Sequence, residues 1–382
     1  MGCGDFTKFL FKSIFKTIMS EKKSAIRLSR LTIKNYKKID YLEIDFPRPL
    51  MKGDADILVF GSKNGGGKTS VLECCSLLTL AGIFGCHFHF YYIAEFPFDI
   101  ANLLVKAGLK DAIITGEFER GNKKCSVSLR IPSENSENWD YMEANFNGDI
   151  SVFEPLRSND NKLNYKEITN SLSSILAFSN EPLIKPPLLH FNSYRKTQEA
   201  HPELGMIAGD SVRAGRFTDF YDPISSFKLE VLRALMGQAS LFEGLKQDES
   251  QSVLSKLNEL IRRYCEGEIE QLRLLPDNKV DIRIKLSNGN ESFSFDGLSS
   301  GQKEMIATLF LIWKNTQNQP SIVLIDEPEL HLNAEWQSGF VRQLHKLAPN
   351  NQYILATHSE TIFRSVDRNH RGLLDSNDNG VK

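Results

Sequence analysis

The first residues suited to chemistry lie in a glycine-rich segment, residues 60–69 (FGSKNGGGKT). A polyphosphate needs backbone N–H groups that point inward, and glycines let the chain wrap closely enough to supply them. Lys68 is expected to place its ammonium on the β- and γ-phosphates of a nucleotide, and the Thr69 hydroxyl to ligate Mg²⁺. Ser62 stands where the usual pattern has glycine, at the loop's entrance. The candidate nucleotide-binding residues of this segment are Asn64, Gly65, Gly66, Gly67, Lys68, Thr69 and Ser70.

A second candidate site follows the apolar run 322–325 (IVLI), which ends in the carboxylates Asp326 and Glu327. Ligands of open α/β sheets bind at the carboxyl ends of the strands. Asp326 is therefore a candidate Mg²⁺ partner, and Glu327 is a candidate general base for an attacking water. The same pair could simply cap a helix that starts at Ala334, but the upstream phosphate loop favours the catalytic interpretation.

Two shorter motifs flank the acidic one. Residues 298–302 (LSSGQ) precede a predicted helix, and a helix start rich in serine and glycine is a ready anion site, although LSSGQ is equally a plain capping motif. Residues 356–359 (ATHS) follow a predicted strand, and His358 there is placed to hydrogen-bond a γ-phosphate. A lone histidine is otherwise more often structural. The candidate ligands of the first motif are Ser299, Ser300, Gly301 and Gln302.

The elements that position these residues follow from hydrophobic periodicity. Strands are expected at residues 26–36, 41–46, 57–60, 188–194, 322–325 and 353–356. Helices are expected at residues 69–80, 302–314 and 334–347, in a short final turn, and across 227–265 with interruptions at Gly237 and Gly244. Hairpins are expected around residues 121–122 and 288–289, and loops across the polar stretch 133–164.

Strand–helix alternation at both ends with an irregular middle predicts an α/β fold, a split mixed sheet that carries an irregular α+β insertion. The expected divisions are an N-terminal extension (1–24), a lobe with the phosphate loop (25–84), an insertion or helical arm (85–289) and a second lobe (290–382).

The bulk composition excludes some classes of protein. The formal net charge of −2 argues against a global basic field, and the six cysteines show no zinc-ligand spacing, which fits buried thiols in a reducing, cytoplasmic setting. Cys86, His87 and His89 lack a second ligand pair for a metal. No run reaches the roughly 20 apolar residues of a membrane-spanning helix. Residues 1–19 have the spacing of an amphipathic helix, which suits membrane or partner contact, a docking helix or an extension before Met19.

In their order along the chain, these motifs resemble the ABC-type ATPase heads of the SMC and RecF superfamily. SKNGGGKTS resembles Walker A, LSSGQ the signature, VLIDEPELHL Walker B with its trailing loop, and ATHS the switch histidine. The resemblance covers residues 26–84 and 290–366 and implies a P-loop NTPase of ABC-head type that hydrolyses ATP with Mg²⁺. It implies Lys68, Glu327 and His358 as catalytic residues, and Thr69 and Asp326 as metal ligands.

The resemblance also implies pairing of two heads. In such heads, the signature of one subunit closes over nucleotide held by the other, which places Ser299 and Gly301 on the γ-phosphate in trans. His358 would sense that phosphate in cis, and residues 329–333 would form a loop crossing the interface of a homodimer or higher homo-oligomer. A Q-loop glutamine is expected before the signature, with Gln198 as its candidate.

The remaining features suggest a branch of the superfamily. There is no heptad run for the long arms of SMC proteins, no membrane span, and no segment of domain size after His358 for the TOPRIM nuclease of the overcoming-lysogenization-defect family. The chain therefore resembles compact RecF-like AAA15/AAA21 ATPases of DNA repair and anti-phage defence. These often act beside a separately encoded nuclease or toxin.

Three hypotheses of function follow. The first is an ATP-gated dimeric switch in defence or repair. The second is a RecF-like ATP-dependent clamp on DNA, unless its basic residues form only a solvated strand edge; they are Lys22, Lys23, Arg27, Arg30, Lys34, Lys37 and Lys38. The third is a nucleotide-bound scaffold that hydrolyses slowly and sequesters a toxin.

Overall fold

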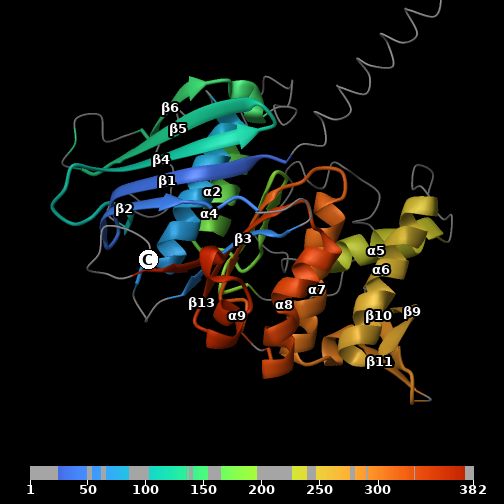
Figure 1. The fold of residues 1–382 in the computed structure, drawn as a ribbon. Coiled ribbons are helices and arrows are strands. Elements are labelled where there is room, and N and C mark those ends of the chain that lie inside the picture. Colours follow the sequence, from blue (N-terminus) through green and yellow to red (C-terminus); the bar gives the residue numbers. More distant parts are fainter. Residues whose placement is uncertain are drawn as a thin grey trace, which may run out of the picture. The chain divides into compact units, whose positions relative to one another are not determined.

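The structure is a computed structural model (Figure 1) that consists of two compact units. It describes residues 25–49, 54–61, 66–85, 103–134, 136, 141–153, 165–195, 226–238, 247–275, 280–289, 291–330 and 332–374. The first unit comprises Met1–Tyr194, Asn315–Glu329 and Ala334–Lys382, and the second comprises Arg195–Lys314 and Leu330–Asn333. Residues 85–194 thus group with the first unit, whereas the sequence suggested an insertion over 85–289; those domain boundaries stay a prediction.

One sheet of the first unit is antiparallel, with strand order β2-β1-β4-β5-β6. Its strands are β1 (Arg27–Tyr36), β2 (Ile39–Asp45), β4 (Asp111–Arg120), β5 (Lys123–Pro132) and β6 (Glu143–Gly148). Along β1, Leu31 and Ile33 are buried and alternate with more exposed polar residues, as expected of a sheet with one covered face. β4 and β5 form the predicted hairpin, in which Arg120 pairs with Lys123.

The other sheet of the first unit has strand order β14-β3-β13-β12-β8-β7. Its strands are β3 (Asp56–Gly61), β7 (Leu183–Lys185), β8 (Leu188–Phe191), β12 (Ile322–Asp326), β13 (Gln352–Thr357) and β14 (Arg371–Leu373). All neighbours pair in parallel except β7 with β8. The central strands β3, β12 and β13 are almost wholly buried, because a parallel sheet is covered on both faces and needs continuous apolar strands.

Helix α2 (Lys68–Phe84) packs against strands of both sheets (Figure 1). Its side chains are apolar on almost every side, as is typical of a helix buried on all faces. Burying one leucine or valine side chain stabilises a fold by about 1.5–3 kcal/mol, so α2 joins the two sheets firmly. A Cβ atom at Gly82 would lie 2.1 Å from the ring of Phe153, in the 3-10 turn η3 (Ile150–Phe153). Glycine therefore allows this close approach.

Further helices complete the first unit: α4 (Tyr165–Ile175), α8 (Ala334–Leu347), α9 (Glu360–Arg364) and the 3-10 turn η8 (Arg368–His370). α8 packs on α9, and α9 packs on β3 and β13. α9 therefore lies close to the strands that precede the phosphate loop and the ATHS motif.

The second unit contains α5 (Ser226–Gln238), α6 (Gln247–Cys265), a three-stranded sheet, η7 (Phe295–Gly297) and most of α7 (Ser300–Thr316). The sheet order is β11-β10-β9, from β9 (Gly267–Leu274), β10 (Val280–Leu286) and β11 (Ser292–Ser294). The ring of Phe227 packs against Phe295 and Phe310. The buried Lys228 ammonium lies 2.7 Å from a carboxylate oxygen of Asp296, so its charge is balanced inside the unit.

Most predicted elements are confirmed, and the expectation of loops throughout residues 133–164 is wrong. Strand β6 lies inside the stretch 133–164 that was expected to be loops, because an edge strand is held by its backbone bonds to β5 and needs little apolar signal. Helix α4 and strands β7, β9 and β14 were not expected. Helix α5 ends at Gln238, one residue after Gly237, and α6 begins at Gln247, in agreement with the expected interruption of the helical stretch.

Several predictions concern residues outside those described: the extension 1–24, Gly244, Gln198 and the Cys86–His89 cluster. Within the described ranges, no group of three or more His, Cys, Asp or Glu is arranged to hold a metal ion. No helix there is long and apolar enough to cross a membrane. The thiols of Cys74, Cys75, Cys125 and Cys265 are buried, as the sequence suggested.

Candidate functional site

The phosphate-loop segment leads directly into α2. Gly67 occupies the N-cap position with a φ of 84°, a left-handed conformation that favours glycine, and no side chain caps the helix. The first N–H groups of any helix have no partner within that helix, so they can bind an anion. A Cβ atom at Gly67 would lie 3.4 Å from the side chain of Ile39. Gly66 and Ser70 lie beside this helix start, whereas Asn64 and Gly65 fall outside the described residues.

Thr69 and Asp326 form a pair of oxygen donors, although they are 257 positions apart. The Thr69 hydroxyl donates to Asp326 Oδ2 over 2.8 Å. Thr69 lies on the exposed side of α2, and Asp326 lies at the buried carboxyl end of β12. Hydroxyl and carboxylate oxygens are the donors that Mg²⁺ prefers, so this pair fits the metal ion implied by the phosphate loop.

Lys68, His358 and Glu327 form a row of charged and polar groups. Lys68 Nζ lies 3.4 Å from His358 Nδ1, and His358 Nε2 lies 3.6 Å from Glu327 Oε1. Burial lowers the pKa of the Lys68 ammonium from its usual range, and the charges of Asp326, Glu327 and Glu329 act in the opposite direction. The fold therefore holds a cation where it is poorly hydrated and close to three carboxylates.

The backbone of Glu327 is unusual. Its φ is 46°, in the left-handed region that costs a residue with a side chain of order 1–3 kcal/mol. Its N–H donates to the carbonyl of Ala356 over 2.8 Å, which continues the pairing of β12 with β13. Such strain persists only where the surroundings impose it, and it clusters at functional sites.

Glu329 is the residue of this site that sequence reasoning assigned elsewhere, to a loop at an interface. Its carboxylate accepts from the Thr357 hydroxyl and from the His358 backbone N–H, each over 2.6 Å. The sequence alone contains no signal for this contact, because it depends on how β12 and β13 pair. Asp326 pairs with Ala356 in the parallel register of β12 and β13, so the residues just beyond both strands must be neighbours.

The signature residues lie together in the second unit, where they form a capping box. The N–H and hydroxyl of Ser299 donate to Gln302 Oε1 over 3.0 and 3.1 Å, and the Gln302 N–H donates to Ser299 Oγ over 3.3 Å. Gln302 Nε2 also donates to the carbonyl of Tyr264 over 3.0 Å. The capping interpretation of LSSGQ is thus confirmed. Ser299 and Ser300 remain exposed, whereas Gly301 is buried.

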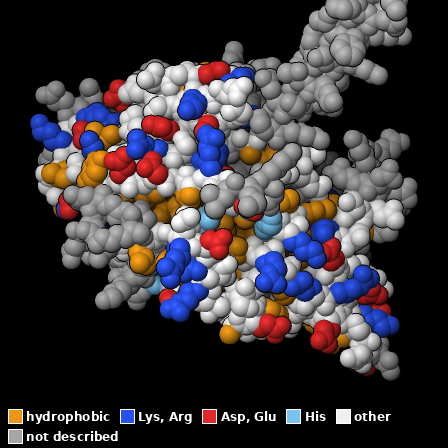
Figure 2. Space-filling model, in the orientation of Figure 1, with side chains coloured by type: hydrophobic (Ala, Val, Ile, Leu, Met, Phe, Trp, Pro, Cys, Tyr) orange, Lys and Arg blue, Asp and Glu red, His pale blue; other side chains and the backbone are white. Residues whose placement is uncertain are grey.

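The proposed basic face is largely neutralised by acidic partners. Arg27 is buried and pairs with Asp56 and Glu119, and Arg30 pairs with Glu43 and Asp45. Lys37 pairs with Glu73 in α2 over 2.6 Å, and Lys34 lies over the ring of Tyr41. On the face drawn in Figure 2, basic and acidic side chains are interspersed. Lys22 and Lys23 fall outside the described residues. The observed pairs do not favour a phosphate-binding face, and β1 is not an edge strand as the alternative supposed, because it lies between β2 and β4.

Together these features define the class. A phosphate-loop helix lies between an antiparallel and a largely parallel sheet, with Thr69 at its start and with Asp326, Glu327 and His358 at the ends of two parallel strands. This is the fold of an ABC-type ATPase head. The resemblance predicted from the motifs is therefore confirmed at the level of the fold.

Comparisons with known proteins agree. The solved structure of an SMC head bound to the C-winged helix domain of ScpA matches with a TM-score of 0.51 and 13% identity, over 93% of this chain and 96% of that chain, and this likeness shows the fold. Residues 217–364, which contain the signature, acidic and histidine motifs, match the family model described as "AAA domain, putative AbiEii toxin, Type IV TA system".

Two curated relatives are ATPases by name. "Retron Ec83 probable ATPase" of Escherichia coli is 23% identical over 421 aligned positions, which cover 91% of this chain and 71% of the relative. "Retron Vc95 probable ATPase" of Vibrio cholerae serotype O1 biovar El Tor is 33% identical over 120 positions, which cover 29% of this chain and only 23% of the relative.

Proposed function

We propose that the chain binds and hydrolyses Mg-ATP as a pair of heads, and that the nucleotide state of the pair is a switch signal in the cytoplasm. The observation that carries this proposal is the 2.8 Å contact between Thr69 at the start of α2 and Asp326 at the end of β12. It brings together two residues, 257 positions apart in the sequence, that we assign to one nucleotide site.

Each side chain has a role in the proposed reaction. Lys68 binds the β- and γ-phosphates, and Thr69 and Asp326 hold Mg²⁺, which when bound neutralises charge on those phosphates. Glu327 accepts a proton from the attacking water, and His358 donates a hydrogen bond to the γ-phosphate. The backbone N–H groups from Asn64 to Ser70 cradle the phosphates. Positioning and charge neutralisation then supply most of the acceleration.

The proposed pairing of heads uses the signature of the second unit, in which Ser299 and Ser300 are exposed. We assign the phosphate contact in trans to Ser299 and Gly301 at the start of α7. ATP bound by both heads favours the closed pair only by its differential affinity for that state. The closed pair therefore persists until hydrolysis.

The biological setting we propose is anti-phage defence, with DNA repair as the broader alternative, and with a separately encoded nuclease or toxin as effector. Support comes from two relatives named for retrons and from a family model whose description refers to a toxin–antitoxin system. A clamp on DNA receives less support, because the candidate basic residues Arg27, Arg30 and Lys37 are paired with carboxylates.

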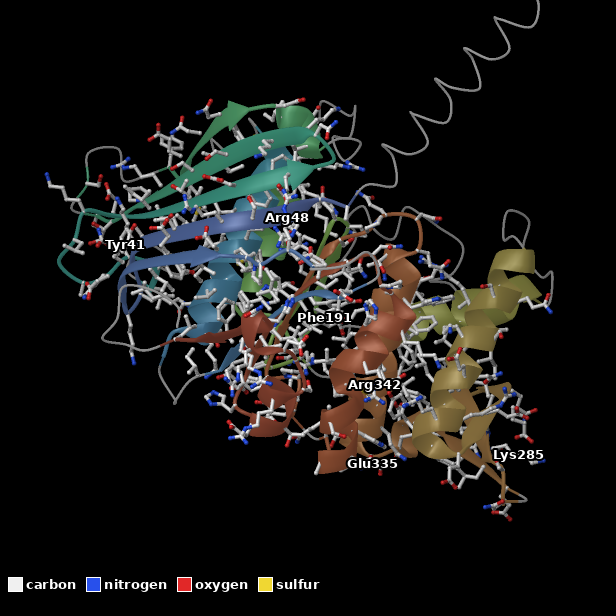
Figure 3. All side chains as sticks on the ribbon, viewed as in Figure 1. Tyr41, Arg48, Phe191, Lys285, Glu335 and Arg342 are labelled. Atoms are coloured by element: carbon white, nitrogen blue, oxygen red, sulfur yellow. The ribbon has the colours of Figure 1, made fainter. Side chains whose placement is uncertain are left out.

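The substitution Glu327→Gln tests the proposal. Removing the general base should slow ATP turnover roughly 10²–10⁴-fold while ATP binding is kept, since Lys68, Thr69 and Asp326 remain. Steady-state phosphate release and equilibrium binding of a fluorescent ATP analogue measure the two effects. Glu335→Gln is the matched control: Glu335 is exposed at the start of α8 (Figure 3) and should leave both values unchanged.

The same experiment separates a switch from a scaffold. Hydrolysis at the wild-type rate in Glu327→Gln would contradict the assigned base. A wild-type protein that binds ATP but releases no phosphate would instead favour a scaffold that holds a toxin inactive.

A further inference from the structure

The turn that carries His358 is held by a carboxylate to which the reaction above assigns no role. Both oxygens of Glu329 are used: Oε1 accepts from the His358 N–H and Oε2 accepts from the Thr357 hydroxyl, each over 2.6 Å. Hydrogen bonds to an ionised acceptor are shorter and roughly twice as strong as neutral ones. The two bonds therefore hold the Thr357 side chain and the N–H of the Thr357–His358 peptide.

The turn is held from its other side as well. Thr357 Oγ1 accepts from the Ser359 N–H over 3.0 Å, and Ser359 caps α9 by accepting from the Ile362 N–H. The Ser359 hydroxyl donates to Gln337 of α8 over 2.7 Å. Glu329 thus anchors a turn whose far side is tied to two helices.

This anchoring determines where the imidazole lies. His358 is more than one-third exposed, so packing alone leaves its ring some freedom. Its ring nitrogens lie 3.4 Å from Lys68 Nζ and 3.6 Å from Glu327 Oε1. A rotation of the Thr357–His358 peptide would change both separations at once.

Glu329 also lies at a boundary between the two units along the chain. It lies two positions after Glu327 and is the last residue of the first unit before Leu330–Asn333, which belong to the second. Glu329 is thus part of the loop after the acidic motif, and its side chain is hydrogen-bonded to the turn that carries His358.

We propose that Glu329 is a positioning residue for His358, through which the loop after the acidic motif sets the imidazole relative to Lys68 and Glu327. This inference rests on the proposed function, because it treats His358 as the group that contacts the γ-phosphate. Glu329 itself touches neither nucleotide nor water in this scheme. Its effect passes through the histidine.

A double-mutant cycle tests the inference. Glu329→Gln keeps the shape of the side chain but removes its charge, so kcat for ATP should fall roughly 10- to 100-fold, the scale usual for a partner that orients a ligating histidine. KM for ATP should stay within about two-fold, because Lys68 and Thr69 are untouched. In a His358→Ala background the same substitution should have little further effect, since coupled residues are not additive.

The outcomes are distinct. Equal losses in both backgrounds would show that Glu329 acts independently of His358 and would overturn the inference. Glu335→Gln again serves as the matched control, with no loss expected in either background. If Glu329→Gln lowers the melting temperature by more than a few degrees, Thr357→Val replaces it in the cycle, because it removes one donor and leaves the Glu329 carboxylate on the His358 N–H.

A second readout needs no ATPase activity. In protein labelled with ¹⁵N-histidine, the ring signals assigned to His358 by their loss in His358→Ala should shift in Glu329→Gln. Unchanged signals would overturn the positioning role even if ATP is hydrolysed. Shifted signals without any ATPase activity would instead support the positioning and contradict the proposed function.

Discussion

Glu73 shows how a single buried charge is accommodated in this fold. The residue lies in α2, is 3% exposed, and accepts hydrogen bonds from the Tyr36 hydroxyl and the Lys37 ammonium. Burial raises the pKa of the Glu73 carboxyl from its usual value, and Lys37 and Tyr36 only partly offset that rise. At the neighbouring site, by contrast, burial lowers the pKa of Lys68. Desolvation disfavours the charged form of both residues, so it raises the pKa of the Glu73 carboxyl and lowers the pKa of the Lys68 ammonium.

The raised pKa of Glu73 predicts a pH dependence of stability. The native state keeps the proton at pH values where the unfolded chain has lost it, so Glu73 contributes most to the free energy of unfolding below about pH 4.5. That contribution falls as the pH rises through the raised pKa. The difference in unfolding free energy between wild type and Glu73→Gln should therefore decrease from about pH 4 towards pH 7, as measured by urea denaturation. A difference that grows with pH would contradict the assigned direction.

At the scale of elements, α2 joins the phosphate loop to the core of the first unit. Its N-terminus carries Lys68 and Thr69, and its other turns lie against both sheets. Two glycines in helices provide a direct comparison of packing. A Cβ atom at Gly82 would meet the Phe153 ring at 2.1 Å, whereas a Cβ atom at Gly339 in α8 would meet nothing within 4 Å.

Gly82→Ala and Gly339→Ala should therefore have opposite effects. The first overpacks the core and should lower the free energy of unfolding by about 1–3 kcal/mol. The second only restricts the unfolded chain and favours the helix, so it should raise that free energy by about 0.5–1 kcal/mol. Chemical denaturation of both variants measures the pair. Stabilisation by Gly82→Ala would show that α2 does not approach Phe153 as closely as described.

The elements also show how far sequence reasoning reached. Continuous apolar runs such as 322–325 identified the central strands, and glycine spacing identified the helix after the phosphate loop. The edge strands β6 and β9 carry weak alternation, because pairing by backbone hydrogen bonds supplies what their side chains do not. The contact of Glu329 with Thr357 depends on the register of two strands that lie far apart in the sequence.

At the scale of the whole molecule, the candidate groups are divided between two compact units. Lys68, Thr69, Asp326, Glu327 and His358 belong to the first unit, and the signature residues belong to the second. The motifs predicted this set of residues, apart from the role of Glu329. In the proposed assembly, the groups of the first unit in one copy of the chain meet the signature residues of another copy. This contact requires two chains.

The most direct measurement of the central claim is the mass of the Glu327→Gln protein in solution with and without Mg-ATP, by sedimentation velocity. Saturating Mg-ATP should at least double the mass. Adding Ser299→Arg should abolish this change while each chain still binds ATP, because the bulky cation blocks the contact in trans. A Glu327→Gln protein that binds one ATP per chain yet keeps its nucleotide-free mass would contradict the pairing of heads.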